Sequence, residues 1–509
     1  MRAEKLMEHP RSSHQPSARR PLRERPSSSM NVTGQGRPQM QPTPRVPAER
    51  DRMTGYVYIA IAVSTLGGLI FGYDIGVSGG AGGFVAGDFH LGAFLQGAVV
   101  SGSTLGGAIG ALAGGPLADR FGRRWTLLLS GVLFSLGALV SALAPDLAVL
   151  MTGRVIVGVG VGAASVLVPV YIAELAPSRV RGALVAGFQL LTTLGILVGY
   201  GINAGLASTE AWRWSLGLAA VPGVLLSLGV LLIPESPRWL VVQGRRDAAL
   251  RVLRRIRGRQ DVAHELEEIE AVNNEDASAH RGRWRDLFRG WVRPMVVVGI
   301  LVAFFANGCG INLIVYFAPQ ILQSVGMGSS ASLLATVGLG VINVVFTAVG
   351  MALVDRVGRK PMLLVGAIGM TVSLAALAVL LALPVSSSTA TLSLVCLAVY
   401  IVVYAVSPGL VAYVVISEIF PLHVRAKATA AATFVIFATN LVIGVFSLPL
   451  LDSIGAPATM TIFAVVCLVF VVFCLRMPET KGRTLEELEE HFRAGSPATT
   501  VEDGTRVGA

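Results

Sequence analysis

Two ionisable side chains lie well inside long apolar stretches of this sequence. Asp74 closes the motif Phe71-Gly-Tyr-Asp74, and Arg154 stands near the start of a separate apolar run. Charge within a membrane is costly and usually has a function. A carboxylate facing a guanidinium can pair with it when ionised and release it when protonated, which is a minimal proton-coupling device. The alternative is a static ion pair that only stabilises the structure.

The apolar runs that contain these residues dominate the composition. Of 509 residues, 53% are hydrophobic and only 14% are charged, against roughly 25% charged residues in a soluble domain. About 20 apolar residues suffice to cross a bilayer core as a helix. Twelve runs reach that length, at about 54–79, 91–117, 124–144, 148–176, 182–206, 212–233, 292–324, 330–354, 360–383, 390–419, 427–451 and 456–476. We therefore predict an all-α membrane protein with twelve transmembrane helices.

A charged, helix-favouring break separates the sixth run from the seventh. We expect residues 234–291 to form an intracellular helical linker between two six-helix bundles, at 53–233 and 292–477. Residues 1–52 are polar and rich in Arg, Pro and Ser, so we expect a disordered cytoplasmic tail there. Residues 478–509 are expected to form a second cytoplasmic tail.

Lys and Arg gather in one set of the loops between the runs, which indicates the orientation of the chain. The opposite set holds almost none, with Arg213 as the exception. By the positive-inside rule, the basic loops and both termini should be cytoplasmic in a multi-pass plasma (inner) membrane protein. The net charge of +10 follows from this arrangement, so we do not expect nucleic acid as a partner.

Three charged motifs occur twice, once in each half of the chain. The pairs are Asp119-Arg-Phe-Gly-Arg-Arg124 with Asp355-Arg-Val-Gly-Arg-Lys360, Glu174-Leu-Ala-Pro with Glu418-Ile-Phe-Pro, and Pro234-Glu-Ser-Pro-Arg238 with Pro478-Glu-Thr-Lys481. Both copies fall on the expected cytoplasmic side. The two halves should therefore be parallel repeats, an organisation that places a binding site near the midplane between them.

These motifs combine carboxylates with arginines, which fork bidentately to carboxylate and can hold helix ends together. We expect one network in each half, acting as a cytoplasmic gate that favours the state closed to the cytoplasm. The members are Asp119, Arg123, Glu174, Arg181, Glu235 and Arg238 in the first half, and Asp355, Arg359, Glu418, Arg425 and Glu479 in the second. The alternative is a set of solvated loop charges that only fix orientation.

Together these motifs resemble those of the sugar porters of the major facilitator superfamily. The loop from Gly114 to Arg124 resembles the conserved superfamily loop. Four further stretches narrow the resemblance from the whole superfamily to the sugar porters. They are Pro234 to Leu240, Pro478 to Gly482, Gly153-Arg154, and Gly310-Ile-Asn312 with Tyr316. The resemblance covers roughly residues 53–490 and implies the major facilitator fold, with sugar or polyol transport by alternating access. Proton-coupled members carry an Asp after Phe-Gly-Tyr, where glucose facilitators often carry Asn, so the resemblance implies proton symport through Asp74 and Arg154.

The resemblance also implies a substrate site, although several of its positions depart from the family pattern. The implied contacts are Phe71, Gln189, Asn307, Asn312, Asn343, Gly409, Tyr413 and Asn440. Ala306 and Asn307 stand where the family usually has two Gln, and Tyr413 and Phe437 stand where it has Trp. These changes alter hydrogen bonding and volume, so a sugar other than glucose or xylose, or a polyol such as an inositol, is expected. A lone Asn in a membrane helix can instead serve helix packing.

The sequence contains no pattern typical of catalysis or of cofactor binding. It has no nucleophile–base pair and no phosphate-cradling loop, and its four cysteines lack metal-ligand spacing. We therefore expect no enzyme, no metal and no cofactor, and a chain that works as a monomer in the lipid bilayer. The alternatives to a symporter are a sugar facilitator, a porter of a non-sugar molecule, and a sugar sensor that does not transport.

Overall fold

The computed structural model describes residues 54–176, 181–209, 211–258, 262–278, 284–288, 290–421, 424–479 and 481. Within them, twelve helices are long and apolar enough to cross a membrane, which confirms the predicted number of spans. The tail predicted at 1–52 and nearly all of the tail after residue 478 lie outside the described residues.

Seven helices build the first half of the chain. They are α1 (Gly55–Asp88), α2 (Ala93–Phe121), α3 (Arg123–Ala142), α4 (Leu147–Leu175), α5 (Arg181–Leu206), α6 (Trp212–Gly217) and α7 (Ala220–Leu232). The linker contains α8 (Pro237–Val242), α9 (Arg246–Arg257), α10 (Ala263–Ser278) and a short 3-10 helix at Trp284–Phe288. Helices α6 and α7 together make the sixth span.

Eight helices build the second half, because two of its spans are broken. They are α11 (Val292–Gly308), α12 (Ile311–Ser324), α13 (Ser329–Val357), α14 (Arg359–Ala382), α15 (Ser387–Val406), α16 (Pro408–Ile419), α17 (Arg425–Ile454) and α18 (Ala456–Arg476). The seventh span breaks at Gly310, whose φ of 91° lies in the left-handed region. The tenth breaks at Ser407, before Pro408, which has no backbone N–H to donate.

Glycines allow the helices of the first half to pack backbone to backbone. On α4, a Cβ at Gly158 or Gly162 would overlap carbonyl groups of α2, and on α2 a Cβ at Gly106 would overlap a carbonyl of α4. Small residues permit this close approach, which is a main source of helix association in lipid. The close contact brings the first turns of α4, including Arg154, directly against α2.

Helix α1 extends further than the sequence predicted. The prediction ended the first span at residue 79, whereas α1 continues to Asp88. The glycines after that point remain helical because other helices pack on them. Gly80 lies against Asn203 of α5, which donates to the carbonyls of Gly76 and Val77 at 3.1 Å each.

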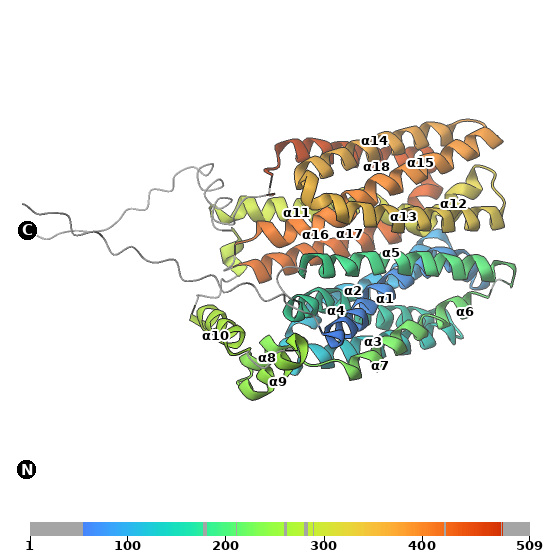
Figure 1. Ribbon diagram of the computed structural model, residues 1–509. Coiled ribbons are helices and arrows are strands. Elements are labelled where there is room, and N and C mark those ends of the chain that lie inside the picture. The colour runs from blue at the N-terminus through green and yellow to red at the C-terminus, as the bar shows by residue number, and fades with distance from the viewer. Residues whose placement is uncertain are drawn as a thin grey trace, which may run out of the picture. The chain divides into compact units, whose positions relative to one another are not determined.

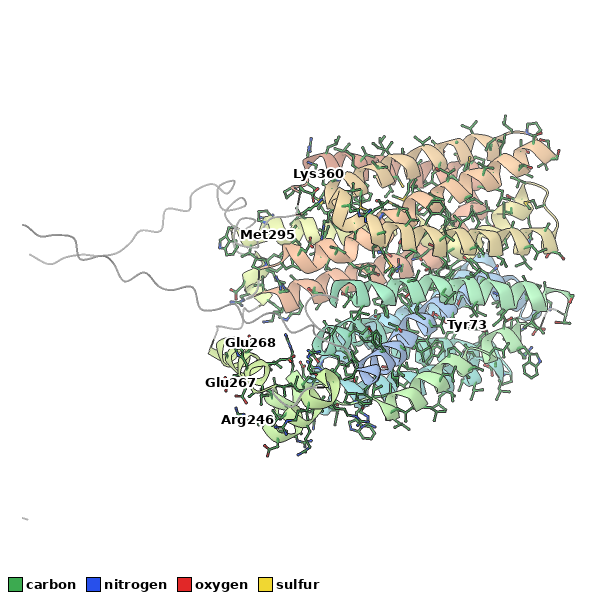
Figure 2. All side chains as sticks on the ribbon, in the orientation of Figure 1. Tyr73, Arg246, Glu267, Glu268, Met295 and Lys360 are labelled. Atoms are coloured by element: carbon green, nitrogen blue, oxygen red, sulfur yellow. The ribbon has the colours of Figure 1, made fainter. Side chains whose placement is uncertain are left out.

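The linker helices mark one end of the bundle, which we call the linker end; the opposite end is the far end (Figure 1). Figure 2 shows Arg246, Glu267 and Glu268 on the linker helices, and Met295 and Lys360 at the same end of the second half. The linker is held by Arg257, which pairs with Glu265 at 2.6 Å and donates to the carbonyl of Leu175 at 3.0 Å.

The two halves meet toward the far end. Gly79 of α1 packs against the backbone of Val315 and Tyr316 on α12. Gly97 of α2 packs against Val445 of α17, and Tyr200 of α5 donates its hydroxyl to the carbonyl of Val315 at 2.8 Å. These contacts join α1, α2 and α5 of one half to α12 and α17 of the other.

Arg213, the exception to the placement of basic residues in one set of loops, has a charge partner in the structure. Arg213 lies at the far end, where its guanidinium donates to Asp88 at 2.9 Å and stacks over the ring of Trp212 at 4.2 Å. Its positive charge is thereby compensated next to the end of α1.

Candidate functional site

Asp74 of α1 and Arg154 of α4 lie together in the interior of the first half. The Nη1 atom of Arg154 stands 2.6 Å from Oδ1 of Asp74, and the two residues are 2% and 5% exposed. A buried pair of this kind is strongly destabilised when one partner is removed, because the other charge is left uncompensated. The geometry gives Asp74 a direct charge partner in the interior of the first half.

Arg154 has further acceptors that sequence reasoning missed. Its Nη2 atom donates to the hydroxyl of Ser78, and to the hydroxyl of Ser103 at 3.0 Å. Longer contacts of 3.4 Å reach the carbonyls of Val99 and Val100. A sequence signal existed for Ser78, which follows Asp74 by four residues and so shares its helix face. Ser103 belongs to α2 and carries no such signal.

The ion pair lies next to the contact between the halves. The phenol of Tyr316 on α12 interacts with Thr104 of α2 and with both charges of the Asp74–Arg154 pair. Gly79, one residue after Ser78, packs against the backbone of Tyr316. Asp74 therefore lies about one and a half helical turns from Gly79, where α1 meets the second half.

The predicted substrate residues lie within the membrane spans of both halves, some inside a helix and some beside a break in a span. The first half contributes Phe71 on α1 and Gln189 on α5. The second half contributes Asn307 on α11, Asn312 on α12, Asn343 on α13, Gly409 and Tyr413 on α16, and Asn440 on α17. The break at Gly310 places two helix ends inside the seventh span. Asn307 and Asn312 flank this break.

Two of these amides have polar atoms without a protein partner. The Nδ2 of Asn312 and the Oδ1 of Asn440 are buried with no hydrogen bond from the part of the chain that the structure describes. Buried polar groups are nearly always hydrogen-bonded, so these atoms are available to a polar ligand. Tyr413 remains 48% exposed. Asn307 differs, since its Nδ2 donates to Ala303 of its own helix at 3.2 Å.

Phe437 and Gly409 take up packing positions. The ring of Phe437 lies over Gly107 of α2, where a Cβ would overlap it, so Phe437 fills space between the halves. Gly409 lies beside the ring of Tyr404, and a Cβ there would stand 2.9 Å from it. Both positions therefore leave little room for a larger side chain without movement of a neighbour.

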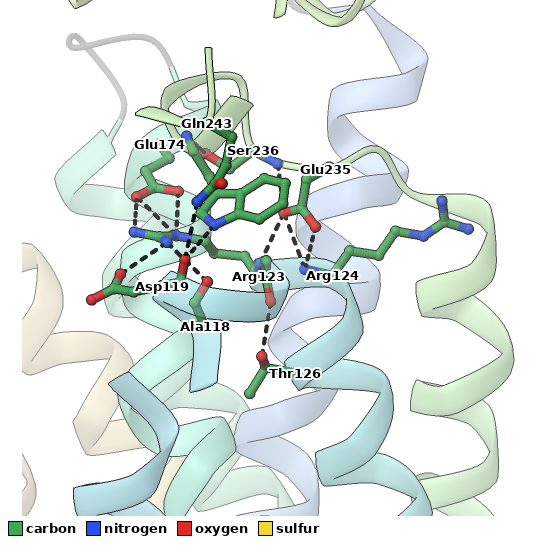
Figure 3. A network of polar contacts seen from close by, with 11 residues as sticks. Ala118, Asp119, Arg123, Arg124, Thr126, Glu174, Glu235, Ser236 and Gln243 are labelled. Carbon is green, nitrogen blue, oxygen red and sulfur yellow. Dashed lines mark hydrogen bonds and ion pairs between the residues drawn. The ribbon is translucent and has the colours of Figure 1, made fainter. Parts of the chain in front are cut away.

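At the linker end of the first half, Arg123 is the centre of a polar network (Figure 3). Its Nη2 lies 3.1 Å from Glu174 of α4, and its Nη1 lies 3.1 Å from Asp119 of α2. The indole of Trp239 on α8 donates to the carbonyl of Asp119 at 2.9 Å. The network thus connects α2, α3 and α4 to the first helix of the linker.

The second half repeats this arrangement. The Nη2 of Arg359 lies 2.8 Å from Glu418, as that of Arg123 does from Glu174. Glu479 accepts from the backbone N–H groups of Arg359 and Lys360 at 3.0 Å each. The matched contacts agree with the repeat that the sequence predicted.

The role of Glu235 differs from the prediction. It accepts from the backbone N–H groups of Arg123 and Arg124 at 2.9 and 3.2 Å, and so caps the first turn of α3 instead of pairing with an Arg side chain. The cap requires Gly122, whose φ is 98° and whose missing Cβ leaves room for the carboxylate. Glu479 and Gly358 form the equivalent cap of α14.

Burial raises the pKa of Glu235 above the usual range of a carboxyl group. The N–H donors from Ser236, Arg124 and Arg123, together with the charge of Arg123, oppose that shift without cancelling it. A carboxyl whose pKa is raised on folding contributes most to stability at acidic pH, and the contribution falls as the pH rises through its raised value. Glu235 therefore caps the helix, and its ionisation costs free energy because the carboxyl group is buried.

Two other predicted network members, Arg238 and Arg425, make no ion pair with the network carboxylates among the described residues. Arg238 is exposed on α8 and has no ion pair among the described residues, because Trp239 takes the inward-facing position beside it. Arg425 donates to the carbonyl of Phe420 at 3.1 Å. The side chains of Arg181 and Asp355 lie outside the described part of the structure.

Replacement of Arg123 by Ala is expected to destabilise the protein. It would leave Glu174, which is largely buried, without its cation, and the expected loss is roughly 2–3 kcal/mol, below the range for fully buried pairs. Thermal unfolding of the purified protein measures this loss. The matched control is Asp119→Ala, which removes a 76% exposed partner of the same Arg and should change stability little. Equal losses in the two variants would contradict this description of the network.

Comparison with known proteins supports the arrangement found here. Residues 60–492 match the family model of the sugar (and other) transporters. The D-xylose transporter of Levilactobacillus brevis is 40% identical over 89% of this chain and 98% of its own length. The arabinose-proton symporter of Bacillus subtilis (strain 168) is 37% identical over 88% of this chain and 97% of its own length.

A solved structure extends the similarity to the fold. The partially occluded inward-open conformation of the xylose transporter XylE from E. coli superposes with a TM-score of 0.74 at 30% identity, and covers 85% of this chain and 100% of that one. The family match spans both halves and the linker between them. The chain belongs to the sugar (and other) transporter family, within the major facilitator superfamily.

Proposed function

We propose that the protein is a secondary active transporter in the plasma membrane that moves a sugar or polyol together with a proton. The observation that carries this proposal is the buried pair of Asp74 and Arg154, which lies beside the contact between the two halves. The arabinose-proton symporter is named as a proton symporter, and its similarity to this chain supports the same coupling here. The protein acts as a carrier, not as an enzyme.

In this proposal the linker end faces the cytoplasm, and so do both termini. Support comes from the basic residues at that end, including Arg123, Arg359 and Lys360, and from the compensation of Arg213 at the far end. Positive charge is enriched on the cytoplasmic side of membrane proteins. A single chain contributes both halves of the site, so a monomer in the lipid bilayer is sufficient for transport.

Alternating access requires the halves to separate at one end while they close at the other. The contacts of Gly79 with α12 and of Gly97 with α17 hold the halves together at the far end. We propose that transport breaks these contacts and joins the linker ends instead. The Arg123 and Arg359 networks then act as the cytoplasmic gate, since each ties together the helix ends that must move as a unit.

The substrate class follows from the polar groups available at the middle of the bundle. The unpaired amide atoms of Asn312 and Asn440, together with Gln189 and Asn343, supply neutral donors and acceptors, and the exposed face of Tyr413 supplies an aromatic surface. Neutral polyhydroxylated molecules fit this combination because they need several directed hydrogen bonds and no countercharge. Uptake of labelled D-xylose, D-glucose, arabinose and myo-inositol into proteoliposomes tests the proposal. Transport of none of them would contradict it.

Ala306→Gln combined with Asn307→Gln is expected to change the order of preference among these four compounds. Both residues are buried beside the break at Gly310, and two longer amides would add hydrogen-bonding groups and volume there. Because a missing or added partner for a buried hydroxyl costs about 1–3 kcal/mol, relative uptake should shift by on the order of tenfold. Competition uptake measures the order. An unchanged order would show that these positions do not face the substrate.

A further inference from the structure

Arg154 is held by more than its charge partner. Besides Asp74, it donates to the hydroxyls of Ser78 on α1 and Ser103 on α2. The hydroxyl of Ser78 gives its own hydrogen to the carbonyl of Asp74 at 2.5 Å, so its lone pairs are free to accept from Arg154. The two serines thus form a pair of neutral acceptors, which we call the hydroxyl pair.

The hydroxyl pair becomes important when Asp74 takes up a proton. A buried guanidinium without an anion must have hydrogen-bond acceptors, or the residue is driven out of its site. The carbonyls of Val99 and Val100 are 3.4 Å away, whereas the hydroxyl of Ser103 is at 3.0 Å. At such distances the carbonyls are weaker partners. Apart from the oxygen that Asp74 keeps when it is protonated, the hydroxyls are therefore the nearest neutral acceptors of Arg154.

We propose that Ser78 and Ser103 are positioning residues that keep Arg154 in place while Asp74 is protonated. This inference rests on the proposed function, in which Asp74 carries the transported proton. Arg154 then keeps one position and links α4 to α1 and α2. Only the charge of Asp74 changes during the cycle. With Arg154 held in place, α1, α2 and α4 keep the same relative arrangement in both protonation states.

The surroundings contain one further titratable group that must be considered. Among the described residues, the Tyr316 phenol on α12 interacts with both Asp74 and Arg154. A phenol stays neutral between about pH 5 and pH 8, since tyrosine titrates near pH 10 or above. The phenol therefore keeps the same charge under the conditions of the experiment.

The test is exchange of a labelled sugar between the two sides of proteoliposomes without a pH gradient. The probe is whichever of D-xylose, D-glucose, arabinose and myo-inositol the wild-type protein transports. Asp74→Asn mimics the protonated carboxyl and should retain exchange. Adding Ser78→Ala and Ser103→Ala to Asp74→Asn should lower exchange by about tenfold or more, because the guanidinium then lacks side-chain hydroxyls as acceptors.

Two comparisons separate positioning from general stability. In the presence of Asp74, the two serine substitutions should lower exchange by less than about threefold, because Arg154 keeps its carboxylate partner. Ser64→Ala is the matched control, since Ser64 is a buried serine of the same helix that donates only to the carbonyl of Ala60 at 2.6 Å. Added to Asp74→Asn, it should leave exchange within about twofold.

Three results would overturn the inference. The first is an equal loss of exchange from the serine substitutions with Asp74 and with Asn at that position. The second is a loss of more than about threefold from the two serine substitutions in the presence of Asp74, which also decides the matter if the triple variant cannot be purified. The third is loss of exchange in Asp74→Asn alone, because Arg154 would then depend on the anion. Failure of the proposed function would give a different result, namely that the wild-type protein accumulates no sugar under a pH gradient.

Discussion

Asp74→Asn is expected to abolish accumulation of sugar against its gradient and to leave exchange across the membrane largely intact. The substitution removes the titrating proton but keeps the size of the side chain and an oxygen that accepts from Arg154. Accumulation requires net movement of protons with the sugar, whereas exchange requires only that the loaded carrier change its orientation. The expected ratio of accumulation to exchange falls by about a hundredfold or more, in line with the loss of a required proton-transfer group.

The measurement uses proteoliposomes with an imposed pH difference for accumulation and equal pH for exchange. Arg213→Ala is a suitable control because it breaks an exposed Arg–Asp pair far from Asp74 and should preserve both activities. If Asp74→Asn still accumulated sugar like the wild-type protein, another residue would carry the proton.

Arg154→Ala is expected to remove both activities and to weaken the fold. The carboxylate of Asp74 would stay buried without its cation, and loss of one partner of a buried pair costs about 3–5 kcal/mol. Arg154 also joins α1 to α2 through the two serine hydroxyls, so its loss should loosen their packing. Thermal unfolding of the purified protein measures the stability, and sugar exchange measures the function.

A second substitution separates the charge of Arg154 from its shape. Arg154→Lys keeps the positive charge but lacks the planar fork that reaches Asp74 and the serines together. It should recover part of the stability and less of the exchange. Full stability and full exchange in Arg154→Ala would show that the pair serves neither the fold nor transport.

The spans and their order could be predicted from the sequence because an apolar run of sufficient length has few alternatives to a membrane helix. The boundary of α1 could not. The glycines after residue 79 disfavour a helix by themselves, and in the structure Gly80 lies against Asn203 of α5 and Gly83 against Gln320 of α12. That packing depends on residues more than a hundred positions away.

The candidate site was predictable only in part, for a related reason. Asp74 and Arg154 could be identified because a charge within an apolar run is exceptional, and the structure brings them together. Ser103 was missed because a serine in a membrane helix is ordinary, and only the rotation of α2 turns it toward Arg154. Glu235 was expected in the network with Arg123, but residue types do not reveal that it bonds the backbone N–H groups of Arg123 and Arg124 and so caps α3.

The central claim is that the Asp74–Arg154 pair couples a proton to sugar movement. The most direct measurement is uptake of the four candidate compounds by wild-type protein in proteoliposomes, with a more acidic exterior and with or without a proton uncoupler. The account predicts that at least one compound accumulates above its external concentration and that the uncoupler abolishes this accumulation. Equilibration of a compound to equal concentrations, unaffected by the pH difference or the uncoupler, would show a facilitator and contradict the claim.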